Sequence, residues 1–436
     1  MNDRIGFLIP EFPGQTHIFL WRERQALADL GIDAELVSTT RPPTGIVSHS
    51  WSQVARNVTL YLMPFSFRDG VLGLIDLLGA GPARWRALFG ALRQAEAESR
   101  WERLRLFAMV LPAAKLARAA KRRRWSHLHV HSCGNAANVA MLCSILSDVS
   151  YSLTLHGPTL ELYGGNQRQK WRHSRFSTVI SKRLYGDVVE RLGLVPADKV
   201  HVAAMGVDVD AIRRRQPYRF WSPGQRCRLF SCGRLNAVKG HEDLLQAVSL
   251  LRSRGIDAHL RIAGEDEQGG RGYRTRLEQE IRYAGLEECV TLLGAVNEEQ
   301  IRQELEAAHI FVLASHNEGI SVAIMEAMSM EMPVVVTDVG GNCELIEEEV
   351  DGLLVPDAQP EELAQAVMRV LTDQELAVRL QGNARAKIIA HFNHHISAAK
   401  LAARLAGGSA VGSTGAHTSI WLGQSSEGVS AIGAQI

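Results

Sequence analysis

The sequence has few cysteines, almost no net charge and no long hydrophobic run. Its 436 residues include six cysteines, at positions 133, 143, 227, 232, 289 and 343, and no Cys-x-x-Cys pair. This spacing excludes a small disulfide-held secreted scaffold, so we expect reduced and mostly buried thiols. The 48 basic and 47 acidic side chains leave a formal charge of +1. A nucleic-acid partner is disfavoured, because binding a polyanion requires a basic field.

The sequence also lacks a targeting or membrane-spanning segment. No stretch of about 18 strongly apolar residues is present, and the amino terminus lacks the apolar core and cleavage site of a signal peptide. We therefore expect a cytoplasmic protein. Apolar residues make up 46% and charged residues 22% of the chain, as in ordinary globular proteins. The length predicts two to three domains at roughly 150 residues each.

Short apolar runs alternate with helical patterns through the first half of the chain. The run 5–9 ends at Pro10, a loop with Pro13-Gly14 follows, and a helical pattern covers 19–30. Further short runs lie at 34–38, 127–131, 151–155 and 178–180. This alternation predicts a parallel α/β sheet.

A second series of the same kind follows the polar segment 213–226. Its apolar runs lie at 228–232, 258–263, 290–293, 310–314, 333–337 and 352–355. They predict a second doubly wound sheet, with a hinge over 206–222. The predicted fold class is therefore α/β, with two Rossmann-like doubly wound domains facing each other across a cleft that binds the ligand.

Two regions outside these series have distinctive compositions. The stretch 65–120 is helical in pattern, carries Trp85 and Trp101 among arginines, and ends in the basic cluster 121–125. Such a surface either lies on anionic lipid or is a solvated helix face whose basic end complements the helix dipole. The tail 407–436 contains seven glycines and a single charged residue. We expect that tail to be mobile or loosely docked.

A glycine-bounded loop follows the strand predicted at 228–232. It contains Gly233, Arg234 and Lys239 and leads into a helix near residue 241. Two cations at the carboxyl end of a strand suit a diphosphate, because a guanidinium binds two oxygens and an ammonium acts as a point charge. Taken alone, the loop is equally compatible with an ordinary surface loop.

Two glutamates flank the start of a helix predicted over 321–330. Glu318 lies in the preceding loop, and Glu326 lies among apolar helix residues. A buried carboxylate requires partners, either hydroxyls or a cation, or else a structural salt bridge. The backbone N–H groups at this helix start are free to bind phosphate or a sugar hydroxyl. They belong to Gly319, Ile320, Ser321 and Val322.

Glu318 and Glu326 reproduce the E-x7-E signature of retaining GT-B glycosyltransferases, and the sequence resembles the GT4 family, which uses nucleotide-sugar donors. The other matching motifs occur in the family's order: Gly233-Arg234-Leu235, Lys239-Gly240, Ala263-Gly264, Leu293-Gly294, Pro333-Val334-Val335, Val339-Gly340-Gly341 with Glu344, and Asp351 to Pro356. The first domain matches more weakly, through 129–131 and 155–157. The opening Glu11-Phe12-Pro13, with Thr16, Phe19 and Arg22-Glu23, is similar to the branch that builds exopolysaccharide or lipopolysaccharide.

The resemblance implies a role for each matching residue. Arg234 and Lys239 would hold the donor diphosphate, Glu326 the ribose hydroxyls, and Glu318 with the N–H groups after Gly319 the transferred sugar. His156 would contact the donor sugar, and the implied catalytic set is His156, Glu318, Arg234 and Lys239. The glycines implied to let backbone approach the donor are Gly14, Gly233, Gly264 and Gly294.

The resemblance also implies an activity and a division of the chain. The activity is retaining transfer of a hexose from a nucleotide diphosphate sugar to a glycan or lipid-linked sugar in bacterial-type polysaccharide biosynthesis, without a metal or cofactor. Residues 1–212 would form the acceptor-side domain and 213–388 the nucleotide-sugar domain. A helix over 389–406 would pack back on the first domain. The basic region 65–125 would contact the cytoplasmic face of the inner membrane.

Several alternatives compete with this interpretation. The same fold also suits transfer to a small sugar phosphate, or a non-catalytic protein that binds nucleotide sugars or glycans. The joint presence of Arg234, Lys239, His156, Glu318 and Glu326 argues against the non-catalytic alternative. Alternate histidines at 127, 129 and 131 resemble a metal-binding His-x-His pattern, but no carboxylate cluster accompanies them. Asp208-Val209-Asp210 resembles the metal-binding Asp-x-Asp motif of the other glycosyltransferase fold, but it lies where GT4 chains carry their linker.

Overall fold

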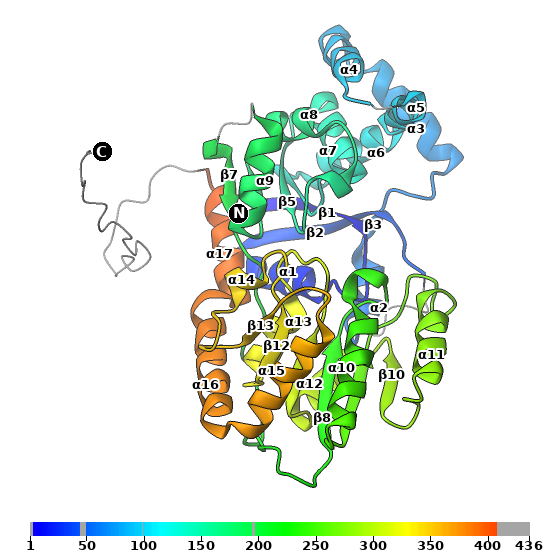
Figure 1. Cartoon of the computed structure of the whole chain (residues 1–436). Helices are drawn as coiled ribbons and strands as arrows, with labels where there is room; N and C mark the ends of the chain where they lie inside the picture. Colours follow the sequence, from blue (N-terminus) through cyan, green and yellow to red (C-terminus); the bar gives the residue numbers. More distant parts are fainter. Residues whose placement is uncertain (1–2, 44–48, 98, 194–196, 408–436) are drawn as a thin grey trace, which may run out of the picture.

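The computed structural model of the chain describes residues 3–43, 49–97, 99–193 and 197–407, so the predicted tail 407–436 lies outside the described residues except for Gly407. Figure 1 shows two α/β bodies, the first domain above the second. All six cysteines are free thiols and four of them are buried, which confirms the expectation drawn from their spacing. Within the described ranges, no helix is both long and apolar enough to cross a bilayer.

The first domain is built on a seven-stranded parallel sheet with the order β3-β2-β1-β4-β5-β6-β7. Its strands are β1 (Asp3–Glu11), β2 (Ile32–Thr40), β3 (Leu60–Tyr61), β4 (His127–Val130), β5 (Ser150–Leu155), β6 (Ser177–Val179) and β7 (Val200–Val202). The sequence predicted all of them except the short edge strands β3 and β7. β3 spans only 2 residues, too few to show a hydrophobic period, and β7 is an edge strand of 3 residues with the polar His201 at its centre.

Alternating side chains of β1 point to the two helical layers that cover this sheet. Ile5, Phe7 and Ile9 pack in one cluster with α1 (Ile18–Asp29), whereas Leu8 packs in another cluster with α6 (Val110–Arg123) and α7 (Asn135–Leu146). The remaining helices are α2 (Ser52–Val58), α3 (Phe67–Leu78), α4 (Pro82–Gln94), α5 (Arg100–Ala108), α6 (Val110–Arg123), α7 (Asn135–Leu146), α8 (Gln167–His173) and α9 (Lys182–Leu192). The helical region predicted at 65–120 thus forms α3 to α6.

The second domain has a six-stranded parallel sheet with the order β10-β9-β8-β11-β12-β13. Its strands are β8 (Cys227–Cys232), β9 (Ala258–Ala263), β10 (Val290–Gly294), β11 (Ile310–Leu313), β12 (Val334–Thr337) and β13 (Leu353–Val355). Its helices are α10 (His241–Ser253), α11 (Tyr273–Tyr283), α12 (Glu298–Ala307), α13 (Val322–Ser329), α14 (Asn342–Leu345), α15 (Pro360–Thr372) and α16 (Gln374–His391). The predicted pair of doubly wound domains is confirmed.

The last helix of the described residues, α17 (His394–Leu405), returns to the first domain. Ala398 and Leu401 of α17 are buried in the core cluster of α1 and β1, and Figure 1 shows α17 alongside that domain. Val207 of the linker forms a parallel bridge with Asn393. A side chain at Gly206 would lie 2.4 Å from the backbone of Asn393. The two segments that connect the domains, one at Gly206 and one at Asn393, are therefore in direct contact. The expected domain boundary at 388 lies inside α16.

Candidate active site

A cleft of about 650 Å³ lies between the two domains, at the carboxyl ends of both sheets. This volume is in the range of ligand pockets, roughly 300–1,000 Å³. The first domain lines the cleft with the loops that follow β1, β4 and β5, and the second with the loops that follow β8, β9, β10 and β11. In parallel α/β sheets this edge is where ligands bind, because the loops there vary while the strands hold them in place.

The cleft brings together eleven of the thirteen residues that the sequence singled out as site residues. The lining members are His156, Gly233, Arg234, Lys239, Gly264, Glu318, Gly319, Ile320, Ser321, Val322 and Glu326. Gly14 and Gly294 do not line it. A side chain on Gly14 would lie 2.7 Å from the His17 ring, and the neighbouring Gln15 and Thr16 face the cleft instead. Gly294 accepts the N–H of Gly264 at 2.9 Å and so supports the lining from behind.

Lys239 and Glu318 form an ion pair in the wall of the second domain. The Lys239 ammonium lies 2.5 Å from Glu318 Oε1, and the Ser315 hydroxyl donates to the same oxygen at 2.8 Å. Both side chains are largely buried, with 16% and 10% exposed. Gly240 holds the loop in place, since a side chain there would lie 1.9 Å from the carbonyl oxygen of Ala314. The site therefore holds an ammonium whose solvation has been replaced by protein groups.

Arg234 lies at the rim of the same wall. Its guanidinium pairs with Glu267 at 3.2 Å and is 46% exposed. Its charge also contributes to the lowered pKa of His17 across the cleft, after the larger effect of burial. Because Glu267 is 77% exposed, this pair costs little to exchange for an anionic ligand.

The loop from Glu318 to Ser321 is held close to both domains by glycines. A side chain on Gly319 would lie 2.6 Å from Ile180 and 2.7 Å from the carbonyl oxygen of His156, both in the first domain. Gly340 and Gly341 pack beneath the loop, where a side chain would lie 2.0 Å or less from its backbone oxygens. The start of α13 therefore lines the cleft together with this loop, and this helix end is positive.

Glu326 forms a buried ion pair with the first domain. Its Oε1 lies 2.9 Å from Nη1 of Arg22 on α1, and the two side chains are 12% and 6% exposed. The two possibilities that the sequence left open, a ligand hydroxyl or a salt bridge, are thus partly resolved. Glu326 has a cation partner and still lines the cleft.

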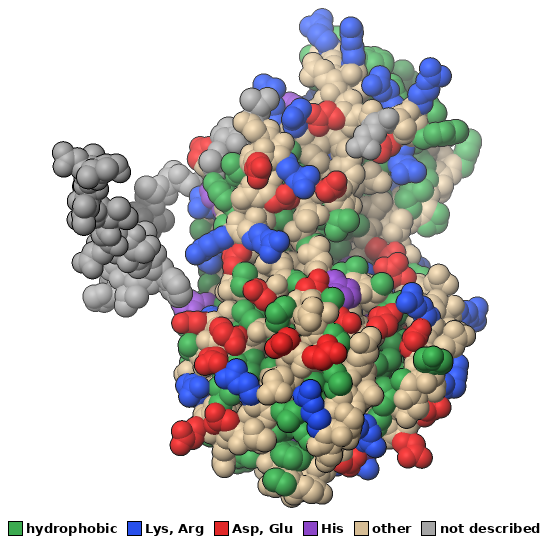
Figure 2. Space-filling view, in the orientation of Figure 1, with side chains coloured by type: hydrophobic (Ala, Val, Ile, Leu, Met, Phe, Trp, Pro, Cys, Tyr) green, Lys and Arg blue, Asp and Glu red, His purple; other side chains and the backbone are tan. Residues whose placement is uncertain are grey.

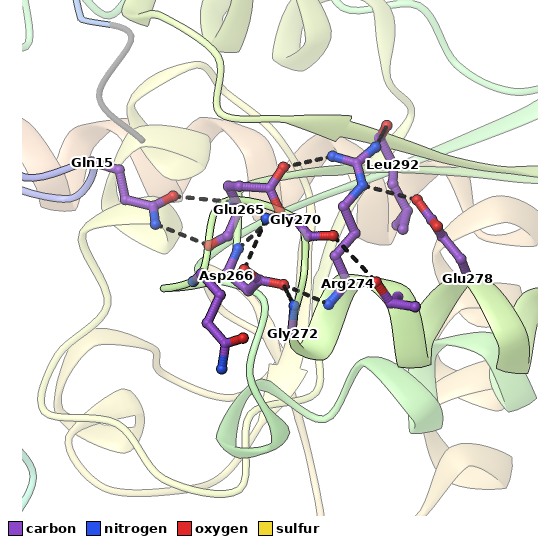
Figure 3. A network of polar contacts seen from close by, with 10 residues as sticks. Gln15, Glu265, Asp266, Gly270, Gly272, Arg274, Glu278 and Leu292 are labelled. Atoms are coloured by element: carbon purple, nitrogen blue, oxygen red, sulfur yellow. Dashed lines mark hydrogen bonds and ion pairs between the residues drawn. The ribbon is translucent and has the colours of Figure 1, made fainter. Parts of the chain in front are cut away.

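Hydrogen bonds from Gln15 join the two domains at one end of the cleft (Figure 3). The Gln15 amide donates to the Glu265 carbonyl at 2.9 Å and accepts the Glu265 N–H at 3.1 Å. Glu298 adds a second contact, accepting hydrogen bonds from His49 at 3.2 Å and from the Ser50 hydroxyl. Burial alone would raise the pKa of Glu298, but these hydrogen bonds lower it to about 2.

Asp266 organises the loop that presents Glu265. Its carboxylate accepts the backbone N–H groups of Gln268, Gly270, Gly272 and Arg274 at 2.9 to 3.0 Å (Figure 3). Burial opposes ionisation, but the four hydrogen bonds together lower the pKa of Asp266. The carboxylate also supplies acceptors to the unpaired N–H groups that begin α11. The sequence analysis missed Glu265, Asp266 and Glu298, because no local motif links them to the first domain.

Two of the three alternating histidines, His127 and His129, form hydrogen bonds to hydroxyl groups of the neighbouring strand β5, and the third, His131, lies 2.9 Å from His156. His127 contacts Ser150 and Ser152 at 2.8 and 2.7 Å, and His129 contacts Ser152 and Thr154 at 2.7 and 3.0 Å. Burial lowers the pKa of all three imidazoles. In the described part of the chain, no group of three or more His, Cys, Asp or Glu side chains is placed to hold a metal ion.

A second, smaller cavity of about 300 Å³ lies in the first domain beside the cleft. Its walls come from the loop after α4, α5, the start of α7 and the segment 162–166. Leu162 and Tyr163 line both cavities, so the two are neighbours that share one wall. Asn135, Asn138 and Asn166 give this cavity several amide groups.

Residues 219–387 match the family model described as glycosyl transferases group 1. Among curated proteins, the amylovoran biosynthesis glycosyltransferase AmsK of Erwinia amylovora is 32% identical over 213 residues, which are 48% of this chain and 50% of that protein. The chain thus spans about half the length of this relative. The putative colanic acid biosynthesis glycosyltransferase WcaL of Escherichia coli K12 is 27% identical over 424 residues, or 92% of this chain and 99% of that protein.

Solved structures share the fold at lower identity. A glycosyltransferase of Rickettsia africae ESF-5 matches 94% of this chain and 100% of its own with a TM-score of 0.69 and 17% identity. HepE of Anabaena, solved with UDP and glucose, matches 92% of this chain and 99% of its own with a TM-score of 0.70 and 18% identity. The predicted GT-B fold and the resemblance to this family of glycosyltransferases are confirmed.

Proposed function

We propose that this chain, whose second domain matches the group 1 glycosyl transferases, is a retaining glycosyltransferase that moves a hexose from a nucleotide diphosphate sugar to a glycan or lipid-linked sugar. One observation supports this most directly. The ammonium of Lys239, the guanidinium of Arg234 and the amino end of α13 converge on one cleft at the carboxyl ends of two Rossmann-like sheets. Such a site is built to receive a diphosphate.

In this proposal the cations stabilise the leaving group. When the bond between sugar and diphosphate breaks, negative charge builds up on the phosphate oxygens, and Lys239 and Arg234 meet that charge from fixed positions. The N–H groups that begin α13 point at the same place. Glu318 holds Lys239 and faces the transferred sugar, and His156 faces that sugar from the first domain. Glu326 accepts the ribose hydroxyls. The proposal requires no metal or cofactor.

The second cavity supports an acceptor position in the first domain. It adjoins the cleft at Leu162 and Tyr163, and its amides can both donate to and accept from sugar hydroxyls. A sugar bound there would reach the donor across this shared wall. The curated relatives are named for amylovoran and colanic acid biosynthesis, which supports an exopolysaccharide or a lipid-linked precursor as the acceptor.

The helices α3 to α5 support contact with a membrane surface. Large apolar side chains stand exposed on them, including Phe67 at 90%, Leu78 at 81% and Trp101 at 77%. Arginines are exposed on the same helices, at positions 86, 93, 100, 103 and 105. Figure 2 shows Lys and Arg side chains at the top of this domain with hydrophobic side chains beside them. We propose that this surface, here called the α3–α5 face, rests on anionic lipid at the cytoplasmic face of a membrane.

Replacing Arg100, Arg103 and Arg105 together by glutamine should reduce cosedimentation with vesicles that contain anionic lipid. Each basic residue near such a surface contributes about 1 kcal/mol, so the partition coefficient should fall by about two orders of magnitude. Replacing the exposed lysine of α17, Lys400, by glutamine is the matched control and should change nothing. If the triple variant bound as well as the parent chain, the α3–α5 face would be an ordinary solvated surface.

The enzyme activity is tested by a thermal-shift and turnover screen against UDP-, GDP-, ADP- and TDP-sugars with EDTA present. Ligand at about 100 times its Kd stabilises the folded chain by about 2.7 kcal/mol, so the true donor should raise the melting temperature. The shift should persist in EDTA, and product analysis should show the anomeric configuration of the donor retained. If no donor shifted the melting temperature, a non-catalytic glycan-binding protein of this fold would be favoured.

A further inference from the structure

The loop between β1 and α1 is fastened to the loop that carries Arg234. The Gln15 amide donates to the Glu265 carbonyl oxygen at 2.9 Å, and the N–H of Leu235 donates to the same oxygen at 3.2 Å. One carbonyl oxygen therefore joins the two loops. It places His17, two residues after Gln15, close to Arg234, and both of these side chains line the cleft.

The ring of His17 is held in place by Phe12 and Gly14. The Phe12 ring stacks on it, with centroids 6.0 Å apart and an angle of 10° between the planes. A side chain on Gly14 would lie 2.7 Å from His17 Nδ1, so it would force the ring to move. The glycine that the resemblance assigned to the donor instead makes room for a histidine.

His17 differs from the other histidines of the cleft because its ring has no polar partner. Four histidines line the cleft. His49 contacts the Gln15 carbonyl oxygen at 2.7 Å and Glu298 at 3.2 Å, and His131 and His156 contact each other at 2.9 Å. Within the described ranges, neither ring nitrogen of His17 has a hydrogen-bond partner. This imidazole is therefore available to a ligand.

Only one nitrogen of this ring can be reached from the cleft. Nδ1 is fully buried, whereas Nε2 is not. Burial, followed by the charges of Arg234 and His49, lowers the pKa of His17 to about 4. The ring is therefore neutral at pH 7 and carries one proton, and with that proton on Nε2 it donates a hydrogen bond into the cleft.

We propose that His17 binds the diphosphate of the donor from the first domain, with its Nε2–H donating to an oxygen of the phosphate group that Arg234 binds from the second. This inference rests on the proposed function, which supplies the nucleotide diphosphate sugar. Hydrogen bonds to a charged acceptor are stronger than those between neutral groups. When the bond between sugar and diphosphate breaks, charge builds up on the phosphate oxygens and this hydrogen bond strengthens. The diphosphate is then held by both domains.

The test is isothermal titration calorimetry of the full chain with UDP, GDP, ADP and TDP. For the nucleotide that binds most tightly, His17→Phe should weaken binding about 10- to 100-fold, the effect of one hydrogen bond to a charged group. Phenylalanine keeps the stack on Phe12 but has no ring nitrogen, so the melting temperature should change little. Binding of the matching nucleoside, which has no phosphate, should stay within about twofold of the parent value.

Two further variants locate the contact at Nε2. His17→Gln should recover most of the affinity, because its amide nitrogen reaches about as far along the side chain as Nε2 does. His17→Asn should not, because its amide reaches only as far as the buried Nδ1. His391→Gln, at an exposed histidine of α16, is the matched control and should bind like the parent chain.

The outcomes separate this proposal from the proposed function. If His17→Phe bound the diphosphate as the parent does while Lys239→Ala bound it weakly, His17 would have no contact with phosphate and the proposed function would stand. If His17→Phe weakened nucleoside and diphosphate binding equally, the ring would only shape the cleft and the proposal would be wrong. If the parent chain bound none of the four nucleotides, both would fall.

Discussion

Replacing Lys239 by alanine should lower the turnover number by about 10²–10³-fold, the usual effect of removing one preorganised charge-stabilising donor. Its ammonium is largely buried, so the interaction with a developing diphosphate charge is weakly screened. Arg234→Ala should cost less, since that guanidinium is 46% exposed. The measurement is the initial rate with the identified donor and acceptor, beside the melting temperature of each variant.

Two further variants distinguish loss of chemistry from loss of structure. Lys239→Ala leaves Glu318 without its cation, which lowers stability, so turnover must be measured well below the melting temperature. Lys239→Arg keeps the charge but changes its geometry, and should recover part of the rate. Lys400→Ala should have no effect, because this exposed lysine lies on α17, away from the cleft. A Lys239→Ala enzyme within fivefold of the parent would remove this residue from the catalytic set.

Replacing Glu326 by alanine should lower the free energy of unfolding by about 3–5 kcal/mol, the usual cost of breaking a buried ion pair. The reason is Arg22, whose guanidinium would stay buried without a countercharge. The measurement is urea unfolding of the parent chain and of Glu326→Ala at pH 7. Glu287→Ala, at an exposed glutamate, should stay within about 0.5 kcal/mol of the parent chain.

The same variant tests the role of Glu326 in donor binding. Arg22→Ala removes the other half of the ion pair but keeps the carboxylate for the ribose. Glu326→Ala should therefore weaken donor binding more than Arg22→Ala, although both lose similar stability. The double variant Arg22→Met with Glu326→Met should regain much of the stability while still binding donor weakly. Equal donor affinities for the two single variants would leave Glu326 a purely structural role.

The second-domain half of the site could be predicted because its residues are neighbours in the sequence. Gly233 to Lys239 and Glu318 to Glu326 each span one loop and the start of the next element, so their local spacing fixes their geometry. Parallel strands place all such loops at the same edge of the sheet. The helix predicted over 321–330 and the α13 found at Val322–Ser329 differ by one residue at each end.

The interdomain contacts could not be predicted because their partners are far apart in the chain. Gln15 and Glu265 are separated by 250 residues, and Arg22 and Glu326 by 304. Glu23 and Ser397 are separated by 374, and meet only because α17 returns to pack on α1. No periodicity or motif specifies such pairs, since each depends on how two folded domains and a returning helix are arranged.

The sequence by itself determined the two α/β domains, the parallel order of short strands and helices, and the cations and carboxylates of the second domain, because these follow from hydrophobic period and local spacing. Only the tertiary structure decided that Glu326 is paired with Arg22, that Gln15 joins the domains, and that His131 and His156 lie in hydrogen-bond contact at the cleft. The physical reason is that the charge state of a side chain depends on burial and on its contacts, and both arise only when distant segments pack together.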